Sequence, residues 1–185
     1  MSRFDFSTFP VLKTTRLVLR ELYEGDADDI FVFRSDPEVQ KYNGVPMADV
    51  AEVAGMVQFS RDQFAGQHGL LWAVERTDDH RVVGLVGLSY DSYHARASAG
   101  YDFARQVWGR GLATEALQAV IRFGFEQMGL NRIEAETIAD NAASVRVLEK
   151  LGFTCEGIRK EYSLEDDGVY HDDAIYALLR QQYTS

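Results

Sequence analysis

Two glycines and an arginine lie directly before a long amphipathic segment in the second half of the chain. Residues 106–116 read QVWGRGLATEA, so that Arg110 stands between Gly109 and Gly111. Glycine lets the backbone approach a ligand closely, and a helix N-terminus offers unpaired N–H groups with a partial positive charge. With Arg105 nearby, this pattern favours a site for a phosphate or pyrophosphate. The alternative is that the glycines only form a tight turn from a strand into a helix.

The spacing of these glycines limits which phosphate ligand is expected. The P-loop pattern GxxxxGK[ST] is absent from the chain. The dinucleotide pattern GxGxxG is half met by residues 109–114, where Thr114 stands in the place of the third glycine, and Glu134 and Glu136 follow at a distance typical of a ribose-binding acid. However, the glycines come several residues after the end of the preceding predicted strand. A dinucleotide-dependent oxidoreductase is therefore a minor alternative.

A second pair of polar residues begins another predicted helix. Asn141 and Ser144 are three positions apart, and Gly152 ends the segment that they begin. Negative charge is stabilised at a helix N-terminus, although both residues are also ordinary at a helix start. Arg146 and Lys150 lie one turn apart on this helix and either reach a phosphate or remain solvated.

The remaining elements alternate in a way that predicts an α/β fold with a mixed sheet. Strands come first, and strand and helix then alternate. The hydrophobic spacing predicts strands at 16–22, 70–76, 81–90, 96–104 and 132–140, and two extended segments around a turn at 165–168. Helices are predicted at 25–36, with Asp26 as cap and a stop near Pro37, at 47–66, with Asp49 as cap, and from Ala113 to Gly129. No repeat or linker interrupts residues 1–185, so we expect a single domain.

Composition and charge exclude several classes of protein. The chain has 185 residues, is 46% hydrophobic and has a net charge of −10. This charge argues against nucleic-acid binding and favours encounter with cationic partners such as amines. No apolar run approaches the roughly 18 residues of a membrane span, and the four histidines lack ligand spacing, so neither a membrane nor a metal is expected. The single Cys155 favours a reducing, cytoplasmic environment.

Taken together, these segments resemble the GNAT superfamily of N-acetyltransferases. The run Gln106-x-x-Gly109-x-Gly111-x-Ala113 is similar to the motif that binds the pyrophosphate of acyl-CoA in that superfamily. The wider segments 100–116, 141–153 and 170–183 resemble the RimJ/RimL-type branch, the ribosomal-protein N-terminal acetyltransferases. The resemblance extends from about Pro10 to Tyr183.

The resemblance implies a single-domain GNAT fold and a set of residues that bind acetyl-CoA. The fold is a mixed, largely antiparallel sheet, flanked by helices, that splays open between its fourth and fifth strands, here 98–104 and 132–139. Pantetheine is expected to pair with the fourth strand in that gap, and the pyrophosphate is expected on the N–H groups of 106–113. The implied set is Tyr101, Asp102, Phe103, Gln106, Val107, Trp108, Gly109, Arg110, Gly111, Leu112, Ala113, Thr114, Asn141 and Ser144, with acetyl-CoA as co-substrate.

The resemblance also assigns catalytic roles, with one departure. Ser144 is expected to donate a proton to the leaving sulfur. Many relatives have a carboxylate two residues before the Gly-Tyr pair of the fourth strand, where this chain has Ser98. Glu161 is the alternative general base that the branch pattern suggests. It also reads as a surface glutamate beside Arg159 and Lys160.

The expected reaction is transfer of an acetyl group to a primary amine. An α-amino group has a pKa of about 7.7–8.0 and lysine about 10.4, so neutralising lysine costs roughly 3 kcal/mol more at neutral pH. A site with a weak base should therefore prefer a protein or peptide N-terminus, or a small amine of low pKa, over lysine. The absence of a carboxylate at Ser98 leaves open a non-catalytic acyl-CoA sensor. The branch resemblance implies a monomer or homodimer.

Overall fold

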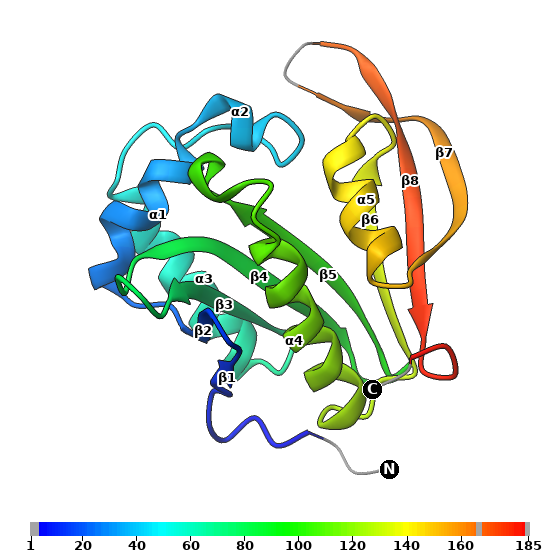
Figure 1. Cartoon of the computed structure of the whole chain (residues 1–185), viewed down its shortest axis with the longest axis horizontal. Coiled ribbons are helices and arrows are strands. Elements are labelled where there is room, and N and C mark those ends of the chain that lie inside the picture. Colours follow the sequence, from blue (N-terminus) through cyan, green and yellow to red (C-terminus); the bar gives the residue numbers. More distant parts are fainter. Residues whose placement is uncertain (1–3, 166–167, 184–185) are drawn as a thin grey trace.

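The computed structural model describes residues 4–165 and 168–183, which contain one eight-stranded sheet (Figure 1). The strand order is β1-β2-β3-β4-β5-β6-β8-β7. All neighbouring strands are antiparallel except β5 and β6, which are parallel. The bounds are β1 (Leu12–Lys13), β2 (Leu17–Glu21), β3 (Gly69–Arg76), β4 (Val82–Asp91), β5 (Arg96–Phe103), β6 (Arg132–Ile138), β7 (Thr154–Leu164) and β8 (Tyr170–Leu179). The predicted turn at 165–168 falls partly outside the described residues.

Helices cover both faces of the sheet. In Figure 1, α4 (Leu112–Glu126) and α5 (Ala142–Lys150) lie in front of the sheet, and α3 (Glu52–Ala65) lies behind it. On the α3 side, α1 (Ala27–Arg34) packs against β4 and is followed by the short α2 (Pro37–Gln40). Two short 3-10 helices, η1 (Glu24–Asp26) and η2 (Arg105–Val107), precede α1 and α4. No helix in the described part of the chain is long and apolar enough to cross a lipid bilayer.

The amphipathic spacing of α4 explains how the front layer is held. Its apolar residues recur every three or four positions and are buried against the sheet, among them Leu117, Val120 and Phe123. The ring of Phe123 meets fully buried Trp72 of β3 edge to face, with ring centroids 5.6 Å apart. The helix therefore has a fixed position on the sheet, and its N-terminus is presented at the end of β5.

The sheet opens between β5 and β6. These strands pair over three residues only, from Arg96 opposite Arg132 to Ser98 opposite Glu134. Beyond Ser98, β5 pairs only with β4, and β6 pairs only with β8. The predicted α/β fold with a splayed, largely antiparallel sheet is thus confirmed.

Two predicted helix caps bind differently from what the sequence suggests. Asp26 occupies the N-cap position of α1, but its buried carboxylate accepts hydrogen bonds from the Arg20 guanidinium and from the Tyr23 N–H rather than from the first turn of α1. The helix predicted at 25–36 runs from Ala27 to Arg34 and so stops before Pro37, which begins α2. The helix predicted at 47–66 starts at Glu52, and Asp49 precedes it in a turn, accepting the Ala51 N–H. Asp26 and Asp49 thus accept hydrogen bonds from groups that precede the helices they were predicted to cap.

The N-terminal segment is tied to the first turn of α4 by one glutamate. Glu115 Oε1 accepts hydrogen bonds from Thr14 Oγ1 (2.6 Å) and the Arg16 N–H (2.9 Å), and Oε2 accepts from Arg16 Nε (2.6 Å). Burial opposes ionisation of Glu115, but these hydrogen bonds and the charge of Arg16 outweigh it and lower the pKa of the carboxyl. Such a group stabilises the fold above its ordinary pKa of about 4.3 and loses this contribution as the pH falls through its folded value.

We expect the Glu115→Gln variant to be less stable than the parent at pH 7, by about 1–2 kcal/mol, because an amide cannot accept all of these bonds. The difference should shrink as the pH falls below about 4, where the parent carboxyl becomes protonated. Urea unfolding at the two pH values measures this. Glu149→Gln, an exposed glutamate on α5, is the control. A difference that does not change with pH would contradict the account.

Candidate active site

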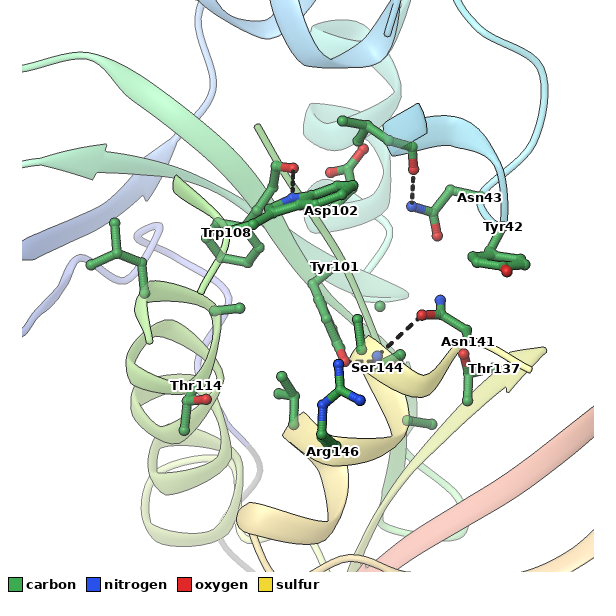
Figure 2. Close-up of a pocket in the computed structure, with 18 of the residues that line it drawn as sticks. Tyr42, Asn43, Tyr101, Asp102, Trp108, Thr114, Thr137, Asn141, Ser144 and Arg146 are labelled. Carbon is green, nitrogen blue, oxygen red and sulfur yellow. Dashed lines mark hydrogen bonds between the residues drawn. The ribbon is translucent and has the colours of Figure 1, made fainter. Parts of the chain in front are cut away.

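A cavity of about 670 Å³ occupies the gap between β5 and β6 (Figure 2). Its walls include the free part of β5, the middle of β6, and the starts of α4 and α5. The turn after α2 contributes Tyr42 and Asn43 on a further side. Because the two strands separate here, their backbone edges are not paired with each other along this stretch, so they are available to a ligand.

The glycine turn adopts a conformation that requires glycine. Gly109 and Gly111 have φ values of +71° and +75°, which is the left-handed region, and Gly111 is the N-cap of α4. The indole Nε1 of Trp108 donates a 2.7 Å hydrogen bond to the Phe103 carbonyl and so ties the turn to the end of β5. Gly109, Gly111 and the first residues of α4 line the cavity, so the start of the helix, where N–H groups lack helical partners, borders it.

Most of the predicted acetyl-CoA set lines the cavity. The predicted residues of β5 line it, and so do Asn141 and Ser144 at the start of α5. The predicted residues of the glycine turn and of the start of α4 also line it, with two exceptions. The two exceptions are Gln106 and Arg110, which are exposed and outside the lining. The backbone carbonyl of Arg110 accepts a hydrogen bond from the Arg16 guanidinium, which connects the turn to the N-terminal segment. The predicted backbone role of this segment stays a prediction.

Ser144 and Tyr101 meet at the start of α5. Asn141 Oδ1 accepts the Ser144 N–H at 3.1 Å, so Asn141 caps the helix as the sequence predicts. Ser144 Oγ lies 2.8 Å from Tyr101 Oη, and Figure 2 shows the phenol pointing from β5 toward the serine. The cap and the phenol together fix the position of Ser144 at the cavity wall.

The phenol of Tyr101 keeps its proton at neutral pH. Burial raises the pKa of Tyr101, and the hydrogen bond to Ser144 only partly opposes this. A phenol is a stronger acid than an aliphatic hydroxyl, so we assign Tyr101 as donor and Ser144 Oγ as acceptor. The hydroxyl proton of Ser144 is then free to be donated to a group in the cavity.

Positive charge at the cavity comes from two side chains that the sequence offered as phosphate ligands and from one that it did not. Arg146 and Lys150 of α5 and Lys41, which follows α2, line the cavity. Arg105 lies outside it and pairs with Asp36, with Nε and Oδ2 3.3 Å apart. In a chain with a net charge of −10, three lining cations and two helix N-termini make this a local site for an anion.

Asp102 faces away from α4 and holds the opposite layer. Its buried carboxylate accepts bonds from Arg34 Nη1 of α1 (2.8 Å) and Gln40 Nε2 of α2 (3.4 Å). Burial raises the pKa of Asp102, against the charge and the hydrogen bond of Arg34. Its side chain therefore fastens α1 and α2 to β5.

Glu161 is not brought to the cavity. It lies on edge strand β7, is exposed, has a φ of +49° and donates its N–H to Asp172 Oδ1 at 2.9 Å. It is outside the lining of the cavity. Its predicted role as general base stays a prediction.

Sequence reasoning missed the contribution of the segment around α2. Tyr42, Asn43 and Lys41 line the cavity because α2 and its turn fold over the end of β5. No periodic pattern marks a four-residue helix, and Pro37 reads as a stop signal. Thr137 of β6 was missed for another reason: a strand threonine has many ordinary roles, and only the splay gives it access to the gap.

Comparisons with known proteins agree with this geometry. The acetyltransferase (GNAT) domain family matches residues 16–154. The chain is 34% identical to the N-acetyltransferase YoaA of Bacillus subtilis, over 93% of this chain and 98% of that protein. It is 29% identical to the [ribosomal protein uS5]-alanine N-acetyltransferase of Escherichia coli, over 94% and 92%. RimJ of Mycobacterium smegmatis, solved in complex with CoA-disulfide, superposes with a TM-score of 0.82 at 22% identity, over 96% and 89%.

Proposed function

The chain belongs to the GNAT family of acetyltransferases, and from this premise we propose that its cavity binds acetyl-CoA and transfers the acetyl group to the α-amino group of a peptide or protein. The observation that carries this proposal is the cavity itself: it lies in the gap between β5 and β6 and is bordered by the glycine turn of α4 and the capped start of α5. None of the comparisons supports the alternatives of a dinucleotide-dependent oxidoreductase or a non-catalytic sensor.

The lining residues divide between the parts of acetyl-CoA. The N–H groups at the start of α4 and the cations Arg146 and Lys150 suit the phosphates, because they offer hydrogen-bond donors and positive charge together. The unpaired edge of β5 at 101–103 suits the amides of pantetheine, which add to a strand edge as a further strand does. The thioester would then lie near the middle of the gap, close to Ser144.

The chemistry needs three events that the site can serve. The neutral amine attacks the thioester carbonyl carbon, the resulting oxyanion collapses, and the C–S bond breaks with release of the thiolate. Ser144 donates its proton to the sulfur, and Tyr101 holds the serine oxygen through the 2.8 Å hydrogen bond until water restores the serine proton. The proton of the attacking amine leaves to water; Glu161 lies outside the cavity lining, so its predicted role needs a separate test.

The acceptor is assigned from acid strength and from a relative. The Escherichia coli relative acts on an alanine of a ribosomal protein, as its name states. The cavity lining provides Glu38, Asp102 and Glu136 as carboxylates, of which Asp102 is bound to Arg34 and Glu136 to Arg159. With two of its three lining carboxylates paired to arginines, the site suits an amine that is largely neutral near pH 8, which is an α-amine.

Acetyl-CoA turnover against a panel of amines tests this function. We expect peptide α-amines to be acetylated at least about 10-fold faster than peptides whose α-amine is blocked and whose lysine is free, because lysine is about 2.5 pKa units less available. The rate of free-thiol release measures turnover of each peptide, and mass analysis of the peptide identifies the acetylated product. Faster turnover of the blocked lysine peptides, or of polyamines, would contradict the α-amine assignment.

The role of Glu161 can be tested by its pH dependence. If Glu161 accepts the amine proton, the Glu161→Gln variant should lose activity at neutral pH, by about 10²-fold, and regain part of it at higher pH, where the amine deprotonates without help. The pH profile of kcat/KM for one peptide measures this. A profile identical to that of the parent would exclude Glu161 and leave water as the proton acceptor.

A further inference from the structure

A second hollow adjoins the cavity on the α3 side of the sheet. It has a volume of about 280 Å³ and shares Asn43, Gly100, Tyr101 and Asp102 with the cavity. Because alternate residues of a strand point to opposite faces, Gly100 lies on the face opposite Tyr101. The hollow therefore opens from the gap on the side away from Tyr101 and the start of α5.

The floor of this hollow is bare backbone. Gly87 of β4 is directly opposite Gly100 of β5, and Ser89 is opposite Ser98. Four small residues in register leave no large side chain on this part of the sheet, although glycine inside a strand costs about 0.5–1 kcal/mol in stability.

Packing does not explain the glycine at 100. A Cβ atom at Gly69 or Gly84 would lie 2.5 Å from a neighbouring atom, so each of those strand glycines is required by its surroundings. A Cβ at Gly100 would meet no atom within 4 Å, and its φ lies outside the left-handed region. Gly100 thus leaves space that no side chain of the described residues fills.

The walls of the hollow are apolar, and its charged residues are already paired. Met56 of α3, Leu71 of β3 and Leu85 of β4 line it, and Met56 and Leu71 are only partly buried although they adjoin the core. The charged side chains among its lining are Arg34 and Asp102, which bind each other at 2.8 Å. Because the charges of Arg34 and Asp102 offset each other, a charged group that entered the hollow would lose water without a full charge of opposite sign to pair with.

We propose that this hollow receives the substituent next to the reacting amine of the acceptor, and that Gly100 sets its size limit, so that the enzyme selects small to medium-sized apolar, uncharged substituents. This inference rests on the proposed function, because it presumes that the amine enters the gap between β5 and β6. It goes further because it assigns selectivity for the acceptor to the two facing glycines, Gly87 and Gly100, and not to a charged residue.

Tripeptides that differ only in their first residue test the proposal. For the parent enzyme, leucine- and methionine-first peptides should have kcat/KM values about 10-fold or more above lysine- and aspartate-first peptides. The ratio of kcat/KM for the leucine-first peptide to kcat/KM for the glycine-first peptide should be about 10-fold lower in Gly100→Ala than in the parent enzyme. It should be lower still in Gly100→Val, because the added side-chain atoms occupy the hollow. Gly157→Ala, a strand glycine that also has open space around its Cβ but lies outside both cavities, should leave the ratio unchanged.

The outcomes separate this inference from the proposed function. The melting temperature and the Kd for acetyl-CoA are measured for each variant, so that a folding or cofactor defect is recognised. If no tripeptide is acetylated by the parent enzyme, the α-amine function itself fails. If tripeptides are acetylated but the leucine-to-glycine ratio is the same in Gly100→Ala, Gly100→Val and the parent, or the lysine-first peptide is preferred, the assignment of the hollow is overturned and the proposed function stands.

Discussion

Replacing Ser144 by alanine is expected to lower kcat about 100-fold and to leave the Kd for acetyl-CoA within about 3-fold of the parent value. The reason is that the hydroxyl acts on the thiolate, which exists only as the C–S bond breaks. The cap of α5 is preserved, because Asn141 accepts the backbone N–H of residue 144 and not its side chain. The fold and the helix N-terminus should therefore remain intact in this variant.

Steady-state kinetics measures kcat, and calorimetry measures the Kd for acetyl-CoA. Tyr101→Phe is the companion variant. In Tyr101→Phe, Ser144 keeps its own proton but loses the 2.8 Å hydrogen bond to the Tyr101 phenol that orients it. We therefore expect kcat to fall about 10-fold, which is less than in Ser144→Ala. If the serine variant retains the parent kcat, water or another group protonates the sulfur. If its loss lies wholly in acetyl-CoA affinity, Ser144 is a binding residue.

Replacing Gly109 by alanine is expected to weaken acetyl-CoA binding at least about 10-fold. The φ of +71° at this position costs a residue with a Cβ about 1–2 kcal/mol, and the added methyl group lies at the wall where the backbone N–H groups must approach the pyrophosphate. Both effects oppose the conformation that the ligand needs.

Gly168→Ala is the matched control for this variant. Gly168 has a φ of +74°, has open space around its Cβ as Gly109 does, and lies outside the cavity. The two variants should lose similar stability in thermal unfolding, but only Gly109→Ala should lose affinity for acetyl-CoA in calorimetry. Equal affinities in the two variants would show that the turn does not contact the cofactor.

Much of the fold was predictable because its elements are long and periodic. The spacing of apolar residues in α4 reflects burial on one face, and the nearly continuous apolar runs of β3 and β4 reflect burial on both faces, which sequence shows directly. The starts of α1 and α3 were not predictable in the same way. Asp26 and Asp49 have the residue type of a helix cap, but neighbouring groups such as the Arg20 guanidinium and the Ala51 N–H decide what each aspartate binds.

The candidate site was predictable where a local motif forms it. The glycine turn and the Asn141–Ser144 pair act within one turn of chain, so their spacing in the sequence reflects their spacing in space. The Tyr101–Ser144 bond joins residues 43 positions apart, and the hollow above Gly100 depends on the register of β4 and β5. Such features arise from packing between distant segments, so no local pattern in a single sequence reveals them.

The central claim is tested most directly by incubating the protein with acetyl-CoA and a peptide that has a free α-amine, and measuring released CoA thiol and acetylated peptide in the same reaction. We predict equal amounts of both, formed only when protein, acetyl-CoA and peptide are all present. Thiol release without acetylated peptide, or no release and no binding of acetyl-CoA by calorimetry, would contradict the account of the cavity between β5 and β6.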